Sequence, residues 1–252
     1  MQFSQALVRR PAPSCAAGLT SATLGAPDYP RTLLQFQAYC DALRSLGVEL
    51  TELPALDAFP DAHYVEDVAV LTPEFALITR PGAPARRGET VHIEAPLAKH
   101  RELLPMQIGR LDGGDVLLLG RRFFIGLTAR TDAQGIAEFE RLVKPFGYSV
   151  QAVPVSDGLH LKSVVNALNE DTLLVAQALV ERPEFEGLRC IPVAPADEYA
   201  GNTLHVNGTL ITPAGFERVH ELLAPLGLPL LVLDTSEFRK MDGGLTCLSL
   251  RF

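Results

Sequence analysis

Paired runs of apolar residues, each pair interrupted by a short polar turn, recur along the chain. They read DVAVLTPEFALITRPG from Asp67, DVLLLGRRFFIGLTART from Asp115, SVVNALNEDTLLVAQAL from Ser163 and NTLHVNGTLITPAG from Asn202. Two apolar runs around a turn such as TPE, GRR, NED or NG are typical of a β-hairpin. The four hairpins start 48, 48 and 39 residues apart, and this regularity predicts an internal repeat.

The segments between the hairpins show a helical period and then return to a strand pattern. In residues 132–147, DAQGIAEFERLVKPFG, the apolar side chains Ile136, Phe139 and Leu142 lie near helical spacing and the segment ends on glycine. The apolar run YSVQAVPV comes next. The same order appears in GFERVHELLAPLG before LPLLVLDT and in YPRTLLQFQAYCDALRSLG before VELTELPA. The repeating unit is therefore predicted to be strand–strand–helix–strand (ββαβ).

The two ends of the chain supply the halves of a fifth hairpin. The final stretch, LTCLSLRF, is predicted to be its first strand with Cys247 inside it, and QALVRRP near the N-terminus is predicted to be its second. Pairing these strands closes a ring of five modules and removes the open edges. The sequence thus predicts a single α/β domain over residues 1–252, a five-bladed α/β propeller with pseudo-fivefold symmetry. The alternative is an ordinary α/β protein with a mixed sheet.

Composition narrows the classes of partner. The chain has 252 residues, of which 47% are hydrophobic, and a net charge of −8, so it has enough apolar content for a sizeable core and no visible basic face for nucleic acid. The N-terminus lacks the apolar stretch of a signal peptide, and no apolar run approaches the ~18 residues of a membrane span. The four cysteines form no CxxC and the six histidines no HExxH. We therefore expect a cytoplasmic protein without a metal site.

Segments that could carry chemistry lie at equivalent places in the repeats. They are YVEDV with Glu66 and Asp67, LDGGDV with Asp112 and Asp115, DGLHLKS with His160, and DGGLTC with Cys247. Equivalent positions in a ring converge on its axis, so these residues are predicted to meet in one site. In a cysteine–histidine–acid site the thiolate attacks, the imidazole moves protons and a carboxylate orients the imidazole. The extra carboxylates favour a cationic reacting group.

Each of these residues also has a plainer interpretation. A cysteine on a buried strand is most often inert, GGD is mostly a turn, a single histidine near a strand is often structural, and adjacent glutamate and aspartate usually face solvent. Independent accidents are not expected to fall at the same phase of a repeat. The shared phase therefore favours a catalytic site.

Long stretches of the chain also match a known family. GLTSATLGAPDY, FPDAHYVEDV, LITRPGAPARRGE, RLDGGDVLLLGRRFFIGLTART, VSDGLHLKS and DTSEFRKMDGGLTCLSLRF span essentially its whole length. Together they resemble the dimethylarginine dimethylaminohydrolase family of the guanidine-modifying, or pentein, superfamily. The resemblance implies a five-bladed α/β propeller of ββαβ modules, the fold that the repeat predicts.

The resemblance also implies a role for each matching residue. It makes Cys247 the nucleophile, His160 the general acid and base, and Asp112 the acid paired with His160. The implied substrate-binding residues are Leu19 on a mobile lid, Asp61 near the α-amino group, Glu66 and Asp67 in the pocket with Asp67 on the guanidinium, Arg86 and Arg130 on the α-carboxylate, and Met241 and Asp242. The plainer interpretation of the two arginines is surface solvation, although arginine is well suited to bind a carboxylate. The chain departs from some relatives at Val68, Asp112 and Thr203, which replace a proline, a glutamate and a cysteine.

The implied reaction is hydrolysis of Nω,Nω-dimethyl-L-arginine, or of Nω-methyl-L-arginine, to L-citrulline and dimethylamine or methylamine. It runs through an S-alkylthiouronium intermediate on Cys247 and needs no cofactor, since the substrate carries its own positive charge. A monomer or homodimer is expected. Two alternatives remain: a small arginine-deiminase-like hydrolase that forms citrulline, and a non-catalytic pentein that uses the propeller as a binding surface.

Overall fold

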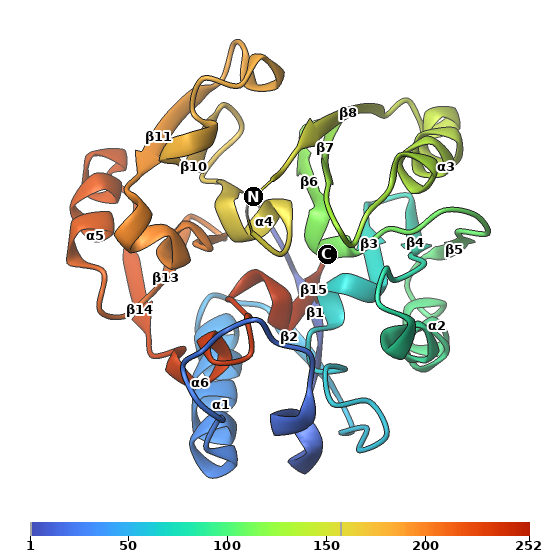
Figure 1. Cartoon of the computed structure of the whole chain (residues 1–252), viewed down its shortest axis with the longest axis horizontal. Helices are drawn as coiled ribbons and strands as arrows, with labels where there is room; N and C mark the ends of the chain where they lie inside the picture. Colours follow the sequence, from blue (N-terminus) through green and yellow to red (C-terminus); the bar gives the residue numbers. More distant parts are fainter. Residues whose placement is uncertain (1, 157) are drawn as a thin grey trace.

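Five three-stranded sheets surround a central axis in the computed structural model, which describes residues 2–156 and 158–252 (Figure 1). In each sheet the middle strand pairs antiparallel with one neighbour and parallel with the other. The first four sheets are β3 (Ala69–Leu71), β4 (Phe75–Ile78) and β5 (Glu102–Pro105); β6 (Val116–Leu119), β7 (Arg122–Leu127) and β8 (Ser149–Pro154); β9 (Val165–Ala167), β10 (Thr172–Ala176) and β11 (Arg189–Val193); and β12 (Leu204–Val206), β13 (Thr209–Pro213) and β14 (Leu230–Leu233). The predicted hairpins and five-module propeller are confirmed.

The fifth sheet joins the two ends of the chain. It contains β15 (Ser249–Arg251), β1 (Gln5–Arg9) and β2 (Glu49–Leu53), with β1 in the middle. Leu7 of β1 lies opposite Leu250 of β15 in an antiparallel register, so the predicted closure of the ring is confirmed. The last strand is shorter than predicted, because residues 246–248 form a 3-10 turn before it.

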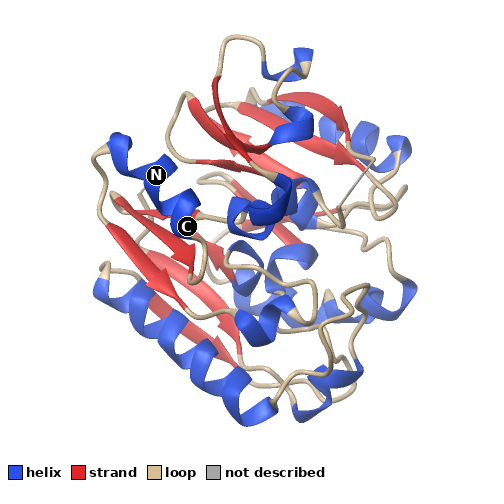
Figure 2. Ribbon diagram, turned by 60° about the vertical axis from the view of Figure 1, so that its left-hand side comes forward, coloured by secondary structure: helices blue, strands red, loops and turns tan. Residues whose placement is uncertain are grey.

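Helices cover the outside of four modules. They are α1 (Tyr29–Ser45), α2 (Val91–Leu97), α3 (Ala133–Val143) and α5 (Glu217–Leu223), while the shorter α4 (Leu161–Val164) and α6 (Ser236–Arg239) precede β9 and follow β14. Asp28 and Asp132 cap the first turns of α1 and α3 by accepting backbone N–H groups. Helix α1 packs against β2 and β14, and Figure 2 shows a long helix lying along a sheet at the edge of the molecule. None of the helices in the described part of the chain is long and apolar enough to cross a membrane.

The third module departs from the predicted repeat. Residues 177–188, all of which the structure describes, contain two 3-10 turns and no α-helix between β10 and β11. This connection is much shorter than residues 79–101 of the first module, and it contains Pro183 and Gly187, which oppose helix formation. The shorter spacing of 39 residues before the fourth hairpin has the same origin.

The apolar core lies between neighbouring modules instead of on the axis. One cluster joins the first two modules through Phe75, Phe123 and Phe139. The rings of Phe123 and Phe139 pack edge to face, with their centroids 4.9 Å apart. Four further clusters fill the other regions of the ring. The middle strands bury their apolar side chains against the flanking helices and strands. The turns that precede the hairpins lie at the axis and carry buried polar side chains.

Candidate active site

A small cavity on the axis brings together most of the predicted site residues. Its volume is about 20 Å³, which has room for a single water molecule. Nine of the eleven predicted residues lie on its wall, together with Tyr64, Leu159 and Gly243; the nine are Leu19, Asp61, Asp67, Arg86, Arg130, His160, Met241, Asp242 and Cys247. An arginine-sized ligand therefore requires part of this wall to move.

Cys247 does not lie inside a strand, as the sequence had predicted, but in the 3-10 turn Thr246–Leu248 that precedes β15. The backbone N–H of Cys247 donates to the carbonyl of Gly244 at 3.3 Å. A Cβ on Gly243 would lie 2.3 Å from the Tyr64 ring, and one on Gly244 would lie 2.5 Å from the Asn202 side chain. Only glycine at these two positions allows the chain to approach so closely, and this approach places the thiol on the cavity wall.

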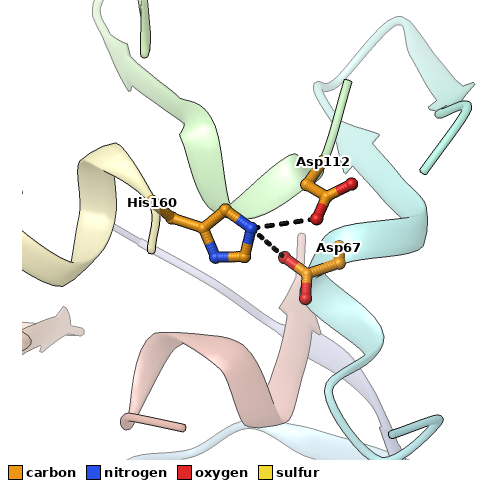
Figure 3. Close-up of side chains that lie close together, drawn as sticks. All are labelled: Asp67, Asp112 and His160. Atoms are coloured by element: carbon orange, nitrogen blue, oxygen red, sulfur yellow. Dashed lines mark hydrogen bonds and ion pairs between the residues drawn. The ribbon is translucent and has the colours of Figure 1, made fainter. Parts of the chain in front are cut away.

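His160 faces two carboxylates that come from two different modules (Figure 3). Its Nε2 lies 2.9 Å from Oδ2 of Asp112 and 3.9 Å from Oδ1 of Asp67. Asp112 also accepts the N–H of Gly82 at 2.7 Å, and Asp67 accepts that of Gly114 at 3.0 Å. The aspartate at position 112, one methylene shorter than glutamate, thus reaches the imidazole. These contacts bring the predicted acid–histidine pair together.

Asp115, which the sequence placed in the same site without a role of its own, belongs to the arrangement. It is fully buried, and its carboxylate accepts the hydroxyls of Thr128 and Thr131 at 2.8 and 2.6 Å and the N–H of Leu161 at 2.9 Å. Thr131 in turn accepts the N–H of Asp112 at 3.1 Å. Asp115 therefore fixes the backbone beside both members of the Asp112–His160 pair. The signal was its place in the DGGD segment, where it opens a hairpin as Asp67 does.

The two proton-carrying groups have strongly displaced pKa values. Burial alone lowers the pKa of His160, but Asp67, the hydrogen bond to Asp112 and the charge of Asp115 outweigh it and raise that pKa to about 9. Burial, followed by the negative charges of Glu66 and Asp67, raises the pKa of the Cys247 thiol to about 12. At neutral pH the free site therefore holds an imidazolium and a protonated thiol.

The two arginines expected to bind a carboxylate have different surroundings. Arg86 is buried and donates to Asp67, to Glu89 at 3.0 and 2.7 Å, and to the carbonyls of Asp61 and Tyr64. Arg130 is 18% exposed and pairs with Asp112 at 3.7 Å. The guanidinium of Arg130 is therefore better placed to receive an incoming anion, whereas Arg86 is largely committed to internal carboxylates.

This difference predicts distinct effects of two alanine variants. Arg130→Ala should raise KM by roughly 10- to 100-fold, the cost of one charged hydrogen bond, with kcat little changed. Arg86→Ala should instead lower the free energy of unfolding by about 3–5 kcal/mol, because it leaves Asp67 and Glu89 buried without their cation. Steady-state kinetics and urea unfolding measure the two effects. An Arg86→Ala protein of normal stability and raised KM would show that Arg86 acts on the ligand.

Leu19 lies on the cavity wall, and two carboxylates hold the chain around it. The N–H of Leu19 donates to both oxygens of Asp61 at 3.1 Å, and the hydroxyls of Thr20 and Ser21 donate to Asp242 at 3.2 and 3.0 Å. Asp242 has a φ of 58°, a left-handed conformation that aspartate tolerates better than most residues. Both carboxylates, which were expected to bind substrate, hold residues 19–21 against the cavity in this structure.

Glu66 lines a different cavity from its sequence neighbour Asp67. Its neighbour Asp67 lines the cavity with Cys247, but Glu66 turns into a second cavity of about 370 Å³ and pairs with Lys162 at 2.6 Å. Adjacent residues of the 3-10 turn Val65–Val68 point in different directions, which explains the separation. The role of Glu66 in the substrate pocket stays a prediction.

The residues in Figure 3 also have ligand atoms close enough to share a metal ion. One atom each of Asp67, Asp112 and His160 lies within 4.8 Å of the others. A histidine must be deprotonated to bind a metal, and the pKa of His160 is raised to about 9. At neutral pH the arrangement therefore favours proton transfer over metal binding.

A cysteine, a histidine and two carboxylates on the axis of a ββαβ propeller define the pentein class of guanidine-modifying proteins. The chain is 40% identical over 99% of its length, and over 100% of the relative, to N(G),N(G)-dimethylarginine dimethylaminohydrolase of Pseudomonas aeruginosa. It is 39% identical to the protein of the same name from Streptomyces coelicolor, over 100% of the chain and 98% of that relative. No family model matches the chain. The chain belongs to the dimethylarginine dimethylaminohydrolase family.

Solved structures give the same result for the fold. A cysteine-to-serine mutant of the Pseudomonas aeruginosa protein in complex with citrulline matches with a TM-score of 0.98 and 39% identity over 100% of both chains. The N-terminal domain of an arginine dihydrolase from cyanobacteria matches with a TM-score of 0.87 over 98% of this chain and 96% of that one. The latter is 19% identical, so it bears on the fold alone.

Proposed function

We propose that residues 1–252 form one catalytic domain that hydrolyses Nω,Nω-dimethyl-L-arginine, and Nω-methyl-L-arginine, to L-citrulline and dimethylamine or methylamine. The observation that carries the proposal is the convergence of Cys247, His160 and Asp67 on one small cavity. Membership of the family supports the substrate, because its relatives bear the name of this reaction.

The polar groups of the cavity match the parts of a methylated arginine. Asp67 carries a negative charge for the guanidinium, and burial, which raises its pKa, is outweighed by His160 and Arg86, so its pKa is lowered. Arg130, partly exposed on the same wall, binds the α-carboxylate. Asp61, at the lid, serves the α-amino group once the contact to Leu19 is broken. Met241 and Asp242 complete the wall beside the lid.

When the cationic substrate binds, the Cys247 thiol loses its proton to solvent, and the resulting thiolate attacks the central guanidinium carbon. The S–C bond forms, the C–N bond to the dimethylamino group breaks, and His160 gives its proton to the departing dimethylamine. The product is an S-alkylthiouronium that retains the positive charge. His160, now neutral, removes a proton from a water molecule, which attacks the same carbon. The C–S bond then breaks and returns the sulfur to Cys247 as thiolate, and the hydroxyl proton of the product passes to solvent to leave citrulline.

The displaced pKa values make the substrate its own activator. The free thiol, with a pKa of about 12, is protonated because it is buried beside two carboxylates. A guanidinium bound at Asp67 neutralises part of that negative field and favours the thiolate. Dimethylarginine carries this charge and citrulline does not, so the product no longer stabilises the reactive form.

A substrate panel tests the function directly. Asymmetric and symmetric dimethylarginine, monomethylarginine, arginine and agmatine are incubated with the protein, and both citrulline and the released amine are measured. The proposal predicts equal amounts of citrulline and dimethylamine from asymmetric dimethylarginine, with agmatine turned over poorly because it lacks the carboxylate for Arg130. A preference for plain arginine, with release of ammonia, would establish the arginine-deiminase-like alternative instead. The absence of turnover with every substrate would support the binding-protein alternative.

We also propose a cytoplasmic location without nucleic acid or membrane partners, and a monomer or homodimer. Four free cysteines support a reducing compartment, and the net charge of −8 disfavours polyanionic partners. Light scattering after gel filtration distinguishes the two oligomeric states.

A further inference from the structure

Residues 241–247, called the nucleophile loop below, follow α6 and end on the nucleophile. Met241, Asp242, Gly243 and Cys247 of this loop line the active-site cavity. Up to residue 245 the loop contains no helix or strand, so its shape depends on hydrogen bonds to neighbouring elements. The position of the thiol depends on the same bonds.

Gly243 is held on both of its backbone polar groups. Its N–H donates to the carbonyl of Phe238 at 2.9 Å, and its carbonyl accepts the hydroxyl of Tyr199 at 3.0 Å. The first bond joins near neighbours in the chain. Tyr199, in contrast, belongs to the turn Pro195–Gly201, which precedes the hairpin of the fourth module. The Tyr199 hydroxyl therefore ties Gly243 to a different module.

The proton of the Tyr199 phenol is directed at Gly243. The phenol oxygen lies 3.0 Å from the carbonyl oxygen of Gly243, and 3.2 and 2.9 Å from the carbonyl and hydroxyl oxygens of Thr235. A phenol has one proton to donate, and the Thr235 hydroxyl can itself donate to the phenol, which leaves the phenol proton for the nearer carbonyl. Burial raises the pKa of Tyr199 above its ordinary value, so the phenol keeps this proton at neutral pH.

The ring of Tyr199 is fixed from outside the cavity. It packs against Phe216 with the ring centroids 5.8 Å apart. The guanidinium carbon of Arg239 lies over both rings, 5.0 Å from the centroid of Tyr199 and 5.3 Å from that of Phe216. Tyr199 lies outside the wall of the active-site cavity, of which Gly243 is part. It is therefore placed to act on the reaction through the loop that it holds.

We propose that Tyr199 is a positioning residue for the nucleophile, whose hydroxyl holds the Gly243 carbonyl and thereby sets the nucleophile loop and the Cys247 thiol in place. The groups assigned to the substrate, Asp67 and Arg130, lie in the turn Val65–Val68 and after β7, and they do not depend on this bond. The proposal rests on the proposed function only for its kinetic readout, because the order of the loop can be measured without a substrate.

The kinetic experiment compares Tyr199→Phe with Tyr148→Phe, with asymmetric dimethylarginine as substrate. Tyr199→Phe removes only the hydroxyl and should lower kcat by roughly 10- to 100-fold, as expected for a misplaced reacting group, while KM and the affinity for citrulline stay within about threefold. Tyr148→Phe is the matched control, since it removes a hydroxyl that donates to Glu74 at 2.7 Å in another part of the ring, and it should keep the wild-type kcat. An unchanged kcat in Tyr199→Phe would overturn the proposal, as would a rise of about tenfold or more in KM with kcat retained.

A second variant determines which bond of the phenol matters. Thr235→Val keeps the size of the side chain and removes the Thr235 hydroxyl, but it leaves the phenol proton free for Gly243. Its kcat should stay within about threefold of the wild-type value. A loss as large as that of Tyr199→Phe would assign the effect to the start of α6, which Thr235 precedes, and the proposal would be wrong.

The structural experiment measures amide hydrogen exchange in the free protein, on peptides that cover residues 241–248. The N–H of Cys247 donates to the carbonyl of Gly244 at 3.3 Å, and that of Thr246 donates to Asn202 at 2.9 Å, so both amides report on the order of the loop. Tyr199→Phe should accelerate exchange in these peptides by about tenfold, the effect of one lost hydrogen bond, and leave the rest of the chain unchanged. Tyr148→Phe and Thr235→Val should keep the wild-type rates in the loop.

The two readouts separate the failure of this proposal from that of the proposed function. If the wild-type protein turns over no methylarginine, the function fails, and the exchange rates still decide whether Tyr199 holds the nucleophile loop. If Tyr199→Phe leaves exchange in the loop unchanged, the proposal fails whatever the turnover. An acceleration spread over all five modules would show a general loss of stability and would contradict a specific role for Tyr199.

Discussion

Replacement of Cys247 by serine is expected to abolish turnover and to leave ligand binding intact. The serine hydroxyl is a far weaker nucleophile than a thiolate, and no neighbouring base activates it, because the pKa of His160 is raised to about 9 and the imidazole is protonated at neutral pH. We expect kcat to fall by at least about 10⁴-fold, as for removal of a nucleophile in other covalent enzymes. Citrulline formation measures the loss, and calorimetry with citrulline measures the retained binding.

The matched control for this variant is Cys190→Ser. Cys190 is also a free cysteine, but it lies in β11 and packs on an apolar cluster away from the active-site cavity. It should keep wild-type activity. Turnover by Cys247→Ser at more than about one per cent of the wild-type rate would contradict the assignment of the nucleophile.

Replacement of His160 by alanine is the second change with a large expected effect. In the proposed mechanism His160 protonates dimethylamine and later deprotonates water, so its removal should lower kcat by roughly 10²- to 10⁴-fold. Protonation of the leaving group is the more important of the two steps, since an amine is a poor leaving group without an added proton. Cys247 should remain open to alkylation in this variant, so that a loss of proton transfer is distinguished from a loss of the site.

The pH dependence of the wild-type protein tests the same residue. The folded pKa of His160, about 9, lies above the ordinary value of ~6.5, so the folded state favours the imidazolium. Its contribution to stability is complete below pH ~6.5 and is lost as the pH rises through about 9. Activity in single-turnover experiments should fall over the same alkaline range as the acid form disappears. A rate that continues to rise above this range would contradict His160 as the acid.

Several features of the fold could be predicted because they arise locally. A hairpin requires two apolar runs and a turn, and these patterns lie within about 16 residues of one another in each repeat. Their spacing then predicted the ring and its closure by the terminal strands. The third module was not predicted correctly. Its connection, residues 177–188, is long enough to join β10 to the parallel strand β11 but too short to include an α-helix.

The site could be predicted only as a set of residues. The phase of the repeat indicated that Asp67, His160 and Cys247 would meet, and they line one cavity. The direction of a side chain on a short 3-10 turn has no sequence period, so the separation of Glu66 from Asp67 could not be derived. The commitment of Arg86 to Glu89 likewise depends on tertiary contacts, although the spacing of three residues was visible in the sequence.

The central claim is that the substrate's own charge activates Cys247. Titration of thiolate absorbance at ~240 nm, with the spectrum of Cys247→Ser subtracted, measures it in the free protein and with a non-reacting cationic arginine analogue. The account predicts no thiolate from Cys247 below about pH 9 in the free protein, since its pKa is raised to about 12, and a clear downward shift when the cation binds beside Asp67. A pKa well below 7 in the free protein that the ligand does not move would contradict it, and would show that a permanent thiolate–imidazolium pair performs the reaction.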